Sequence, residues 1–426
     1  MTSDLAIYGG PQAVQTDPGD MFKWPIITRE DEEAVLEVLR AGKMSAIDET
    51  LELEREFADW HGVDYALACN NGTASLHSAM FGCGVGLGDE IICQSLTIWS
   101  SALPALNLGA TVVFADVDPE TMTLDPADVE RKITDSTKAI IVVHYFGYPA
   151  DMDAIMDVAG RHGVKVIEDV SHAHGALYNG RLVGTLGDVA AMSVMSEKSL
   201  AMGEGGFLIT DDQKIWERAV AFGHYERTGF RLDVIEDPAL RKYGRMPLGG
   251  HKYRISQMST AVGRVQLRHY RERMEEIQSA MNYFWDLLEG VPGLRAHRPP
   301  ADSGSTKGGW YSPKGQYVSD EMGGLSVHRF CEAVRAEGFP TRPGLNDLMH
   351  LHPVLNEADV YGHGTPTRIA NTQRDVRQGE GSLPVSEALP ERAFDVPWFK
   401  HYRPETIKEY ASAFRKVAEH AAELEE

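Results

Sequence analysis

The chain has 426 residues, of which 43% are hydrophobic and 24% charged, and its net charge is −22. This length exceeds one compact core and predicts two or three domains. Such an acidic surface repels phosphate backbones and anionic lipid, so we expect neither nucleic acid nor a membrane as a partner.

No apolar run is long enough to span a bilayer, and the first residues lack the basic flank and apolar stretch of a secretory signal. We therefore expect a cytoplasmic protein. Its four cysteines, at irregular spacings, argue against a disulfide framework and a zinc site; they are Cys69, Cys83, Cys93 and Cys331.

The first predicted elements are helices. Thr28 is suited to cap a helix over residues 30–41, with Asp31 at the third helical position and Gly42 as the stop. A second helix is expected over residues 51–62.

Short β-branched runs then alternate with helical stretches such as residues 74–84 and 125–133. The expected strands cover residues 66–70, 90–94, 111–117, 139–146, 164–169 and 189–194. Strands that read as unbroken apolar runs are typical of a parallel sheet covered on both faces, with ligands at the carboxyl ends of the strands. The pattern predicts an α/β fold.

A long helical stretch at residues 274–290 precedes a loop rich in Pro, Ser and Gly, at residues 297–310. We therefore expect a large domain over residues 1–290 and a smaller C-terminal α+β domain over residues 291–426. The second domain is predicted to hold a strand at 315–320, a helix at 326–338, an irregular stretch at 362–381 and a final helix from Pro404.

An acid that closes one buried strand and a lysine that follows the next suggest cofactor chemistry. Asp169 ends one strand, and Lys198 follows the next. A lysine amine can hold the aldehyde of pyridoxal 5'-phosphate (PLP) as a Schiff base, while a carboxylate facing the ring nitrogen keeps the pyridine protonated. Asp169 ends an apolar strand, where an unpaired carboxylate is costly, so it needs such a cation or donor.

The segment from Asn70 to His77 follows a strand and opens a helix. Its Gly72, Thr73 and Ala74 can point backbone N–H groups at a phosphate, and Ser193 can add a hydroxyl. The alternative is an ordinary Asn-Gly turn in which Thr73 caps the helix.

Three further features lie near these segments. His172 is suited to donate a hydrogen bond to the phenolic oxygen of the cofactor. Together with His174, Glu168 and Asp169 it could instead form a metal site, but no second His/Cys cluster supports that alternative. Trp99 is able to stack on a ring, although a lone Trp in an apolar segment is more often core. Gly203–Gly206 let the backbone pass close to Lys198, or form a plain tight turn.

In chain order, the segments GGPQAV, NNGTASLH, ADVDPETMTLDP, VHYFGYPADM, EDVSHAHGA, SxxxxKxxxxGEGG and LPVSEALPERAFDVPWF together resemble the DegT/DnrJ/EryC1/StrS family of sugar aminotransferases. The resemblance covers essentially the whole chain. It implies fold type I of the PLP enzymes, a mostly parallel seven-stranded sheet, and a homodimer with active sites shared between subunits.

The resemblance also implies roles for single residues. Lys198 would hold the cofactor and shuttle protons, Asp169 would pair with the pyridinium, His172 would contact the phenolic oxygen, and Thr73 and Ser193 would bind phosphate.

The chain departs from the family pattern at three places. Ile98 occupies the position of the usual aromatic residue, and Trp99 follows it. Lys252 stands where the family often has an Asn that reaches the neighbouring subunit's phosphate, and we expect the lysine to meet that phosphate as a point charge. The segment 227–247 is longer than the family pattern and is a candidate for shaping substrate choice.

The implied activity is transfer of an amino group from glutamate or glutamine to a keto-sugar, with or without a nucleotide, or to a ketocyclitol, in amino-sugar, antibiotic or polysaccharide biosynthesis. Two alternatives stay open: a PLP-dependent sugar dehydratase, although the dehydratases of this kind carry histidine in place of the Schiff-base lysine, and a non-catalytic PLP-binding regulatory protein. Candidate substrate contacts are Tyr145, His251 and the Lys43–Glu49 loop.

Overall fold

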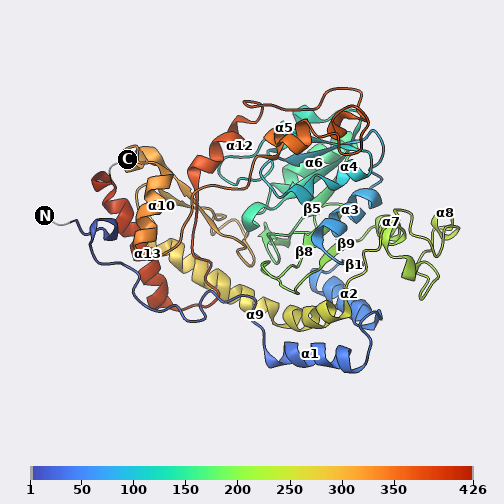
Figure 1. Cartoon of the computed structure of the whole chain (residues 1–426), viewed down its shortest axis with the longest axis horizontal. Helices are drawn as coiled ribbons and strands as arrows, with labels where there is room; N and C mark the ends of the chain where they lie inside the picture. Colours follow the sequence, from blue (N-terminus) through green and yellow to red (C-terminus); the bar gives the residue numbers. More distant parts are fainter. Residues whose placement is uncertain (1–2, 425–426) are drawn as a thin grey trace.

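A seven-stranded sheet forms the centre of the larger part of the molecule (Figure 1). The computed structural model describes residues 3–424. In spatial order the strands are β1 (Tyr65–Cys69), β9 (Gly206–Thr210), β8 (Val189–Ser193), β5 (Lys165–Asp169), β4 (Thr137–Val143), β2 (Glu90–Gln94) and β3 (Thr111–Ala115). Only β9 runs antiparallel to its neighbours in this sheet, so the expected α/β fold with a mostly parallel sheet is confirmed.

The sheet is buried on both faces, which explains why its strands read as continuous apolar runs. In β8, Val189 and Ala191 join one core, while Ala190 and Met192 join another on the opposite face. Helices α3 (Gly72–Gly82) and α7 (Gln213–Gly223) pack on the first face; α2 (Asp48–His61), α5 (Pro126–Lys132), α6 (Met152–His162) and α9 (Gln257–Leu287) contribute to the second.

Strand β9 was not among the strands expected from the sequence. It is a five-residue apolar segment that directly follows a glycine-rich turn, and its position between β1 and β8 is a matter of tertiary pairing. This pairing sets Cys69, Gly206 and Ser193 side by side at the carboxyl edge of the sheet. The segments after β1 and β8 therefore begin next to each other.

A second, three-stranded antiparallel sheet lies beside a separate hydrophobic core. It contains β10 (Leu294–Ala296), β11 (Lys314–Tyr317) and β12 (Ala393–Asp395), and helices α10 (Val327–Ala336) and α13 (Pro404–Glu419) pack against this core. The C-terminal half of α9 reaches from the large sheet into it, as Figure 1 shows.

The division at residue 290 stays a proposal, because side-chain packing crosses it in both directions. Leu5, Val14 and Met21 belong to the second core, although they lie at the start of the chain. Conversely, Leu355 and Leu383 pack with the core of the large sheet. The two ends of the described chain meet, since Ser3 donates a hydrogen bond to Glu423 at 2.6 Å.

The remaining elements connect these layers. Helix α1 (Arg29–Arg40) starts as expected, with the Thr28 amide donating to Asp31 at 2.8 Å, whereas α9 begins well before the stretch 274–290 predicted for it. The shorter elements are α4 (Pro104–Asn107), α8 (Pro238–Arg241), α11 (Pro353–Asn356), α12 (Pro384–Ala388), β6 (Leu177–Tyr178) and β7 (Arg181–Leu182). Within residues 3–424, no helix combines the length and apolarity that crossing a bilayer requires.

The carboxylate of Glu168 holds the loop that leads into β8. It is fully buried, and it accepts hydrogen bonds from the backbone amides of Gly184, Leu186 and Gly187 at 2.7–2.8 Å. Burial alone would raise the pKa of Glu168, but the His144 ring at 2.9 Å and these amides hold it below its usual value. The charged carboxylate thus fixes the strand that precedes Lys198.

We expect the substitution Glu168→Gln to lower the free energy of unfolding by about 2–4 kcal/mol, because an amide cannot satisfy so many donors in a buried position. Urea unfolding followed by circular dichroism measures this. The matched control is Glu130→Gln, an exposed carboxylate paired with Arg161, for which we expect no measurable change because water screens an exposed ion pair. Equal effects of the two substitutions would contradict the role assigned to Glu168.

Candidate active site

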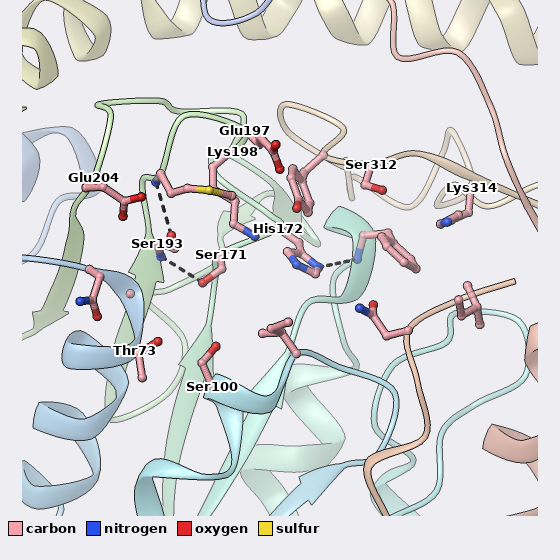
Figure 2. A pocket seen from close by; sticks show the side chains of 18 residues that line it. Thr73, Ser100, Ser171, His172, Ser193, Glu197, Lys198, Glu204, Ser312 and Lys314 are labelled. Carbon is pink, nitrogen blue, oxygen red and sulfur yellow. Dashed lines mark hydrogen bonds between the residues drawn. The ribbon is translucent and has the colours of Figure 1, made fainter. Parts of the chain in front are cut away.

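A cavity of about 510 Å³ opens at the carboxyl edge of the large sheet (Figure 2). We call it the catalytic cavity. Its lining residues come from the ends of β1, β2, β4, β5 and β8 and from two distant loops: Asn71, Gly72, Thr73, Ile98, Ser100, Phe146, Ser171, His172, Ser193, Met195, Glu197, Lys198, Glu204, Tyr311, Ser312, Lys314, Leu345 and Asn346. The sequence predictions Gly72, Thr73, His172, Ser193 and Lys198 are all brought together here.

One end of the cavity is formed by the N-terminus of α3. Asn71 caps this helix: its side-chain oxygen accepts from the Ala74 amide at 2.8 Å. The first helical amides, those of Gly72 and Thr73, have no partner within the helix and lie at the cavity wall. The expectation that the Ala74 amide faces an anion is not supported, because the Asn71 side chain already uses that N–H group. The cap is Asn71, so Thr73 is not the capping residue either.

Close backbone packing at this end explains two of the glycines. A Cβ atom on Gly72 would lie 2.6 Å from the Cβ of Ser193, and one on Gly206 would lie 2.5 Å from the carbonyl oxygen of Asn71. Only glycine lets the start of α3 lie this near to the end of β8. The packing forms a cradle of backbone N–H groups and hydroxyls, which suits a phosphate.

Lys198 lies in the middle of the cavity, in the loop that connects β8 to β9. Its side chain is buried, and its Nζ lies 4.0 Å from the centre of the Tyr311 ring. Burial lowers the pKa of Lys198 to about 8, against the opposing charges of Asp169 and Glu197. At pH 7 roughly 10% of such a lysine is a neutral amine, compared with well under 0.1% of an ordinary one.

Asp169 is buried beneath the cavity, at the end of β5. Its Oδ2 accepts from the Ser101 hydroxyl at 2.7 Å, and its Oδ1 accepts from the Ser171 amide at 3.1 Å. These donors orient the carboxylate and leave lone pairs for a cationic group above it.

The His172 ring forms part of the cavity wall, near the rings of Phe146 and Tyr311. The Phe146 amide donates to Nδ1 at 3.3 Å, as the dashed line in Figure 2 shows. Burial, together with the nearby charge of Lys198, lowers the pKa of His172 well below its ordinary value. The ring is therefore neutral, with its proton on Nε2, and that atom is a hydrogen-bond donor.

Besides Ala74 and the underlying Asp169, two further predicted residues, Trp99 and Lys252, do not line the cavity of their own chain. Trp99 lies between two lining residues, Ile98 and Ser100, but its own side chain is 53% exposed and not part of the wall. The geometry favours Ile98 over Trp99 as the apolar surface against a ring. Lys252 is exposed and outside this cavity, so a role at a neighbouring subunit stays a proposal.

The candidate substrate contacts also lie outside the lining. Tyr145 is buried behind it and donates to Asn346, which does line the cavity, at 2.5 Å. His251 stacks on Tyr253, and Lys43 pairs with Asp48 at the exposed loop 43–49.

Sequence reasoning missed several lining residues, above all Tyr311, Ser312, Lys314 and Asn346. They come from the loop before β11, from β11 itself and from a segment preceding α11, and no motif marks them. Lys314 forms an ion pair with Asp395 of the neighbouring strand β12.

The side chains considered for a metal site have other partners. Glu168 is used by His144 and the loop amides, and His174 accepts or donates at Ser199 at 3.3 Å. In the part of the chain that the structure describes, residues 3–424, no three His, Cys, Asp or Glu side chains gather as a metal ion would require.

A buried lysine with a lowered pKa, a buried carboxylate and a helix N-terminus at one sheet edge define a fold type I enzyme of the PLP class. The chain belongs to the DegT/DnrJ/EryC1/StrS aminotransferase family, whose sequence profile it matches over residues 25–415. It is thus an aminotransferase, and membership of this family indicates dependence on PLP.

Similar proteins include both cyclitol and nucleotide-sugar enzymes. The chain is 32% identical, over the full length of both proteins, to an L-glutamine:2-deoxy-scyllo-inosose aminotransferase of Streptoalloteichus tenebrarius. It is 33% identical to a GDP-perosamine synthase of Caulobacter vibrioides, with 83% of this chain and 94% of that one covered. Among solved structures, the aminotransferase from Psychrobacter cryohalolentis superposes with a TM-score of 0.80 at 28% identity, covering 94% of this chain and 99% of that one.

We expect the attachment of PLP to the cofactor-free protein to accelerate with pH and to level off above about 8, because only the neutral amine of Lys198 attacks an aldehyde. Stopped-flow absorbance measures the rate, with N-acetyl-lysine as the reference amine. Glu197→Gln removes a charge that raises this pKa, so the midpoint should move to lower pH. A midpoint near the ordinary lysine value, 10.5, would contradict the inferred burial.

Proposed function

We propose that the chain binds PLP in the catalytic cavity and transfers an amino group from L-glutamine or L-glutamate to a ketocyclitol or keto-sugar. The observation that carries this proposal is the burial of Lys198 in one cavity with the α3 N-terminus, above Asp169. When bound, PLP supplies an aldehyde for the lysine and a pyridine ring that accepts electrons.

Each cavity residue has a task in this proposal. The amides of Gly72 and Thr73, with the Ser193 hydroxyl, hold the phosphate. Asp169 keeps a proton on the ring nitrogen through charge attraction, and His172 donates from Nε2 to the phenolic oxygen. Ile98 packs against one face of the ring.

Lys198 has two tasks, which its pKa of about 8 suits. As a neutral amine it forms and releases the bond to the cofactor. Once released, it removes a proton from the α carbon of the amino donor and returns a proton to the cofactor carbon, as a general base and acid near neutral pH.

A ketocyclitol is the acceptor class that we favour. The charges at the cavity are the carboxylates of Glu197 and Glu204, Lys198 itself, and Lys314, which Asp395 neutralises. With Ser312 and Asn346 these groups suit the hydroxyls of a polyol better than a diphosphate. The full-length similarity to inosose aminotransferases supports the same choice, while the similarity to GDP-perosamine synthase keeps a nucleotide-linked keto-sugar as a second candidate.

The alternatives of a dehydratase and of a regulatory protein fit the site less well. The catalytic cavity contains an intact lysine with a lowered pKa, and a protein that only binds the cofactor needs no such base.

We expect the purified protein to convert 2-deoxy-scyllo-inosose to the amine with L-glutamine labelled with ¹⁵N at the α-amino group, which mass spectrometry of the product detects. Lys198→Ala should fold and lose at least about 1000-fold in rate, since it removes both the covalent link and the base. Lys214→Ala, at an exposed position of α7, is the control and should keep the activity. Turnover by Lys198→Ala without added amine refutes the assignment, and amination of a GDP-linked keto-sugar alone favours the second candidate.

We further propose a homodimer whose active sites are shared. Large apolar side chains are exposed on α1 and in the loop after it, beside the cavity, and on the segment 227–247 with its continuation: Leu39, Met44, Ile98, Trp99, Phe230, Met246 and Leu248. A partner that covers these side chains would remove them from water, and a second copy of the chain is the partner that the family resemblance implies. Helix α8 projects from the main body in this region (Figure 1). Lys252 would then reach the partner's phosphate.

We expect sedimentation velocity to show a dimer for the wild-type protein and monomers for Met246→Asp, because a charge would be buried at the interface. The monomers should also bind PLP more weakly, by about tenfold or more, as they lack the second subunit's Lys252. Leu87→Asp is the control: Leu87 is exposed to 78% and lies before β2, at the other end of the sheet. Dimers of unchanged stability for Met246→Asp would refute the proposed interface.

A further inference from the structure

A second cavity of about 520 Å³ lies beside the catalytic cavity, between the N-terminal segment and the second core. We call it the aromatic cavity. It is lined by Pro18, Phe22, Trp24, Glu197, Phe339, Pro340, Trp398, Lys400 and Tyr410. Glu197 borders both cavities, so the two are neighbours across the loop that carries Lys198.

The walls of the aromatic cavity are rings held in place by their neighbours. The indole N–H of Trp24 donates to the carbonyl oxygen of Lys198 at 2.8 Å, and that of Trp398 donates to Gly309 at 3.0 Å. Phe22 packs edge-on against Tyr410, with ring centres 5.3 Å apart. Because the polar edges of both indoles are already used, the cavity presents ring surfaces, which favour a flat apolar group.

Lys400 is the exception in this apolar wall. Its side chain is 2% exposed, and among residues 3–424 its Nζ has no hydrogen-bond partner. Its Nζ lies against the rings of Trp398 and Trp24, which attract a cation but accept no conventional hydrogen bond. Burial lowers the pKa of Lys400 well below its usual value.

Other buried lysines of this chain show what a satisfied ammonium requires. Lys307 donates to the carbonyl oxygen of His297 at 2.8 Å and to its Nδ1 at 3.1 Å. Lys314 pairs with Asp395. A buried amine that is left without an acceptor costs free energy, and the wall of an open cavity is where a ligand can supply one.

We propose that the aromatic cavity is a second ligand site, which binds a small anion with a flat apolar body, the anionic group at Lys400 and the body between Phe22, Phe339 and Trp398. Glu197, at the border with the catalytic cavity, would repel the anionic end and so orient the ligand. The Trp24 hydrogen bond to Lys198 links the site to the catalytic loop.

Isothermal titration calorimetry of the purified holoenzyme tests this with phenylacetate and its uncharged analogue phenylacetamide. We expect phenylacetate to bind at least tenfold more tightly than the amide. Lys400→Met should abolish this preference, and Lys408→Met, an exposed lysine of α13 paired with Glu405, should keep it. Addition of L-glutamine, which enters the catalytic cavity, should not displace phenylacetate, because the two ligands occupy different cavities.

Three results would overturn the proposal: no binding of phenylacetate, equal binding of the two probes, or a preference that survives in Lys400→Met. Phe339→Asp provides a second variant at a partly exposed wall position, where its charge should pair with Lys400 and exclude phenylacetate. If Lys400→Met fails to fold, the comparison of the two probes on the wild-type protein and on Phe339→Asp still decides.

Discussion

Two opposite charges are buried close to one another without pairing, and the site depends on this separation. In the described residues Asp169 and Lys198 form no ion pair. Asp169 is held by the Ser101 hydroxyl and the Ser171 amide, while Lys198 lies over the Tyr311 ring. Burying either group without a partner costs free energy in a low dielectric. The space between them leaves room for a cofactor whose cationic ring nitrogen pairs with Asp169 and whose aldehyde reacts with Lys198.

The strand order of the large sheet produces this arrangement. Because β9 lies between β1 and β8, the end of β1 and the end of β8 reach the same edge, and Gly206 passes between them. The glycine at position 72 then allows the start of α3 to lie against Ser193. The amides of Gly72 and Thr73 and the loop that carries Lys198 are therefore both attached to the ends of sheet strands. Glu168 in turn holds the loop that leads into β8, through hydrogen bonds from its backbone amides.

The sequence predicted those parts of the site that are local. Asp169 and Ser193 end strands that apolar runs reveal, His172 and Lys198 follow these strands, and Gly72 opens a helix in a recognisable turn. These residues could be found because the carboxyl ends of parallel strands lie at the same edge of a sheet, so residues near those ends are expected to meet. The Ala74 amide could not, since its use by the Asn71 cap depends on a side-chain rotamer.

What the sequence did not show depends on contacts between distant segments. Tyr311, Lys314 and Asn346 reach the cavity from beyond residue 300, and the pairing of β9 joins segments far apart in the chain. Leu5 and Met21 likewise pack with a core formed mainly by the C-terminal part of the chain. The aromatic cavity also joins distant segments, since its walls combine residues 18–24 with residues 339–410. No periodicity or motif encodes such meetings.

The central claim is that PLP bound in the catalytic cavity takes up and passes on an amino group, with Lys198 as the amine that holds the cofactor and as the base. The most direct measurement is the identity of the cofactor after the purified holoenzyme has been incubated with L-glutamine alone, released by acid and separated by chromatography. The account predicts conversion of pyridoxal phosphate to pyridoxamine phosphate in the wild-type protein, reversed on adding 2-deoxy-scyllo-inosose, and none in Lys198→Ala. Pyridoxal phosphate that stays unconverted with both L-glutamine and L-glutamate would contradict it.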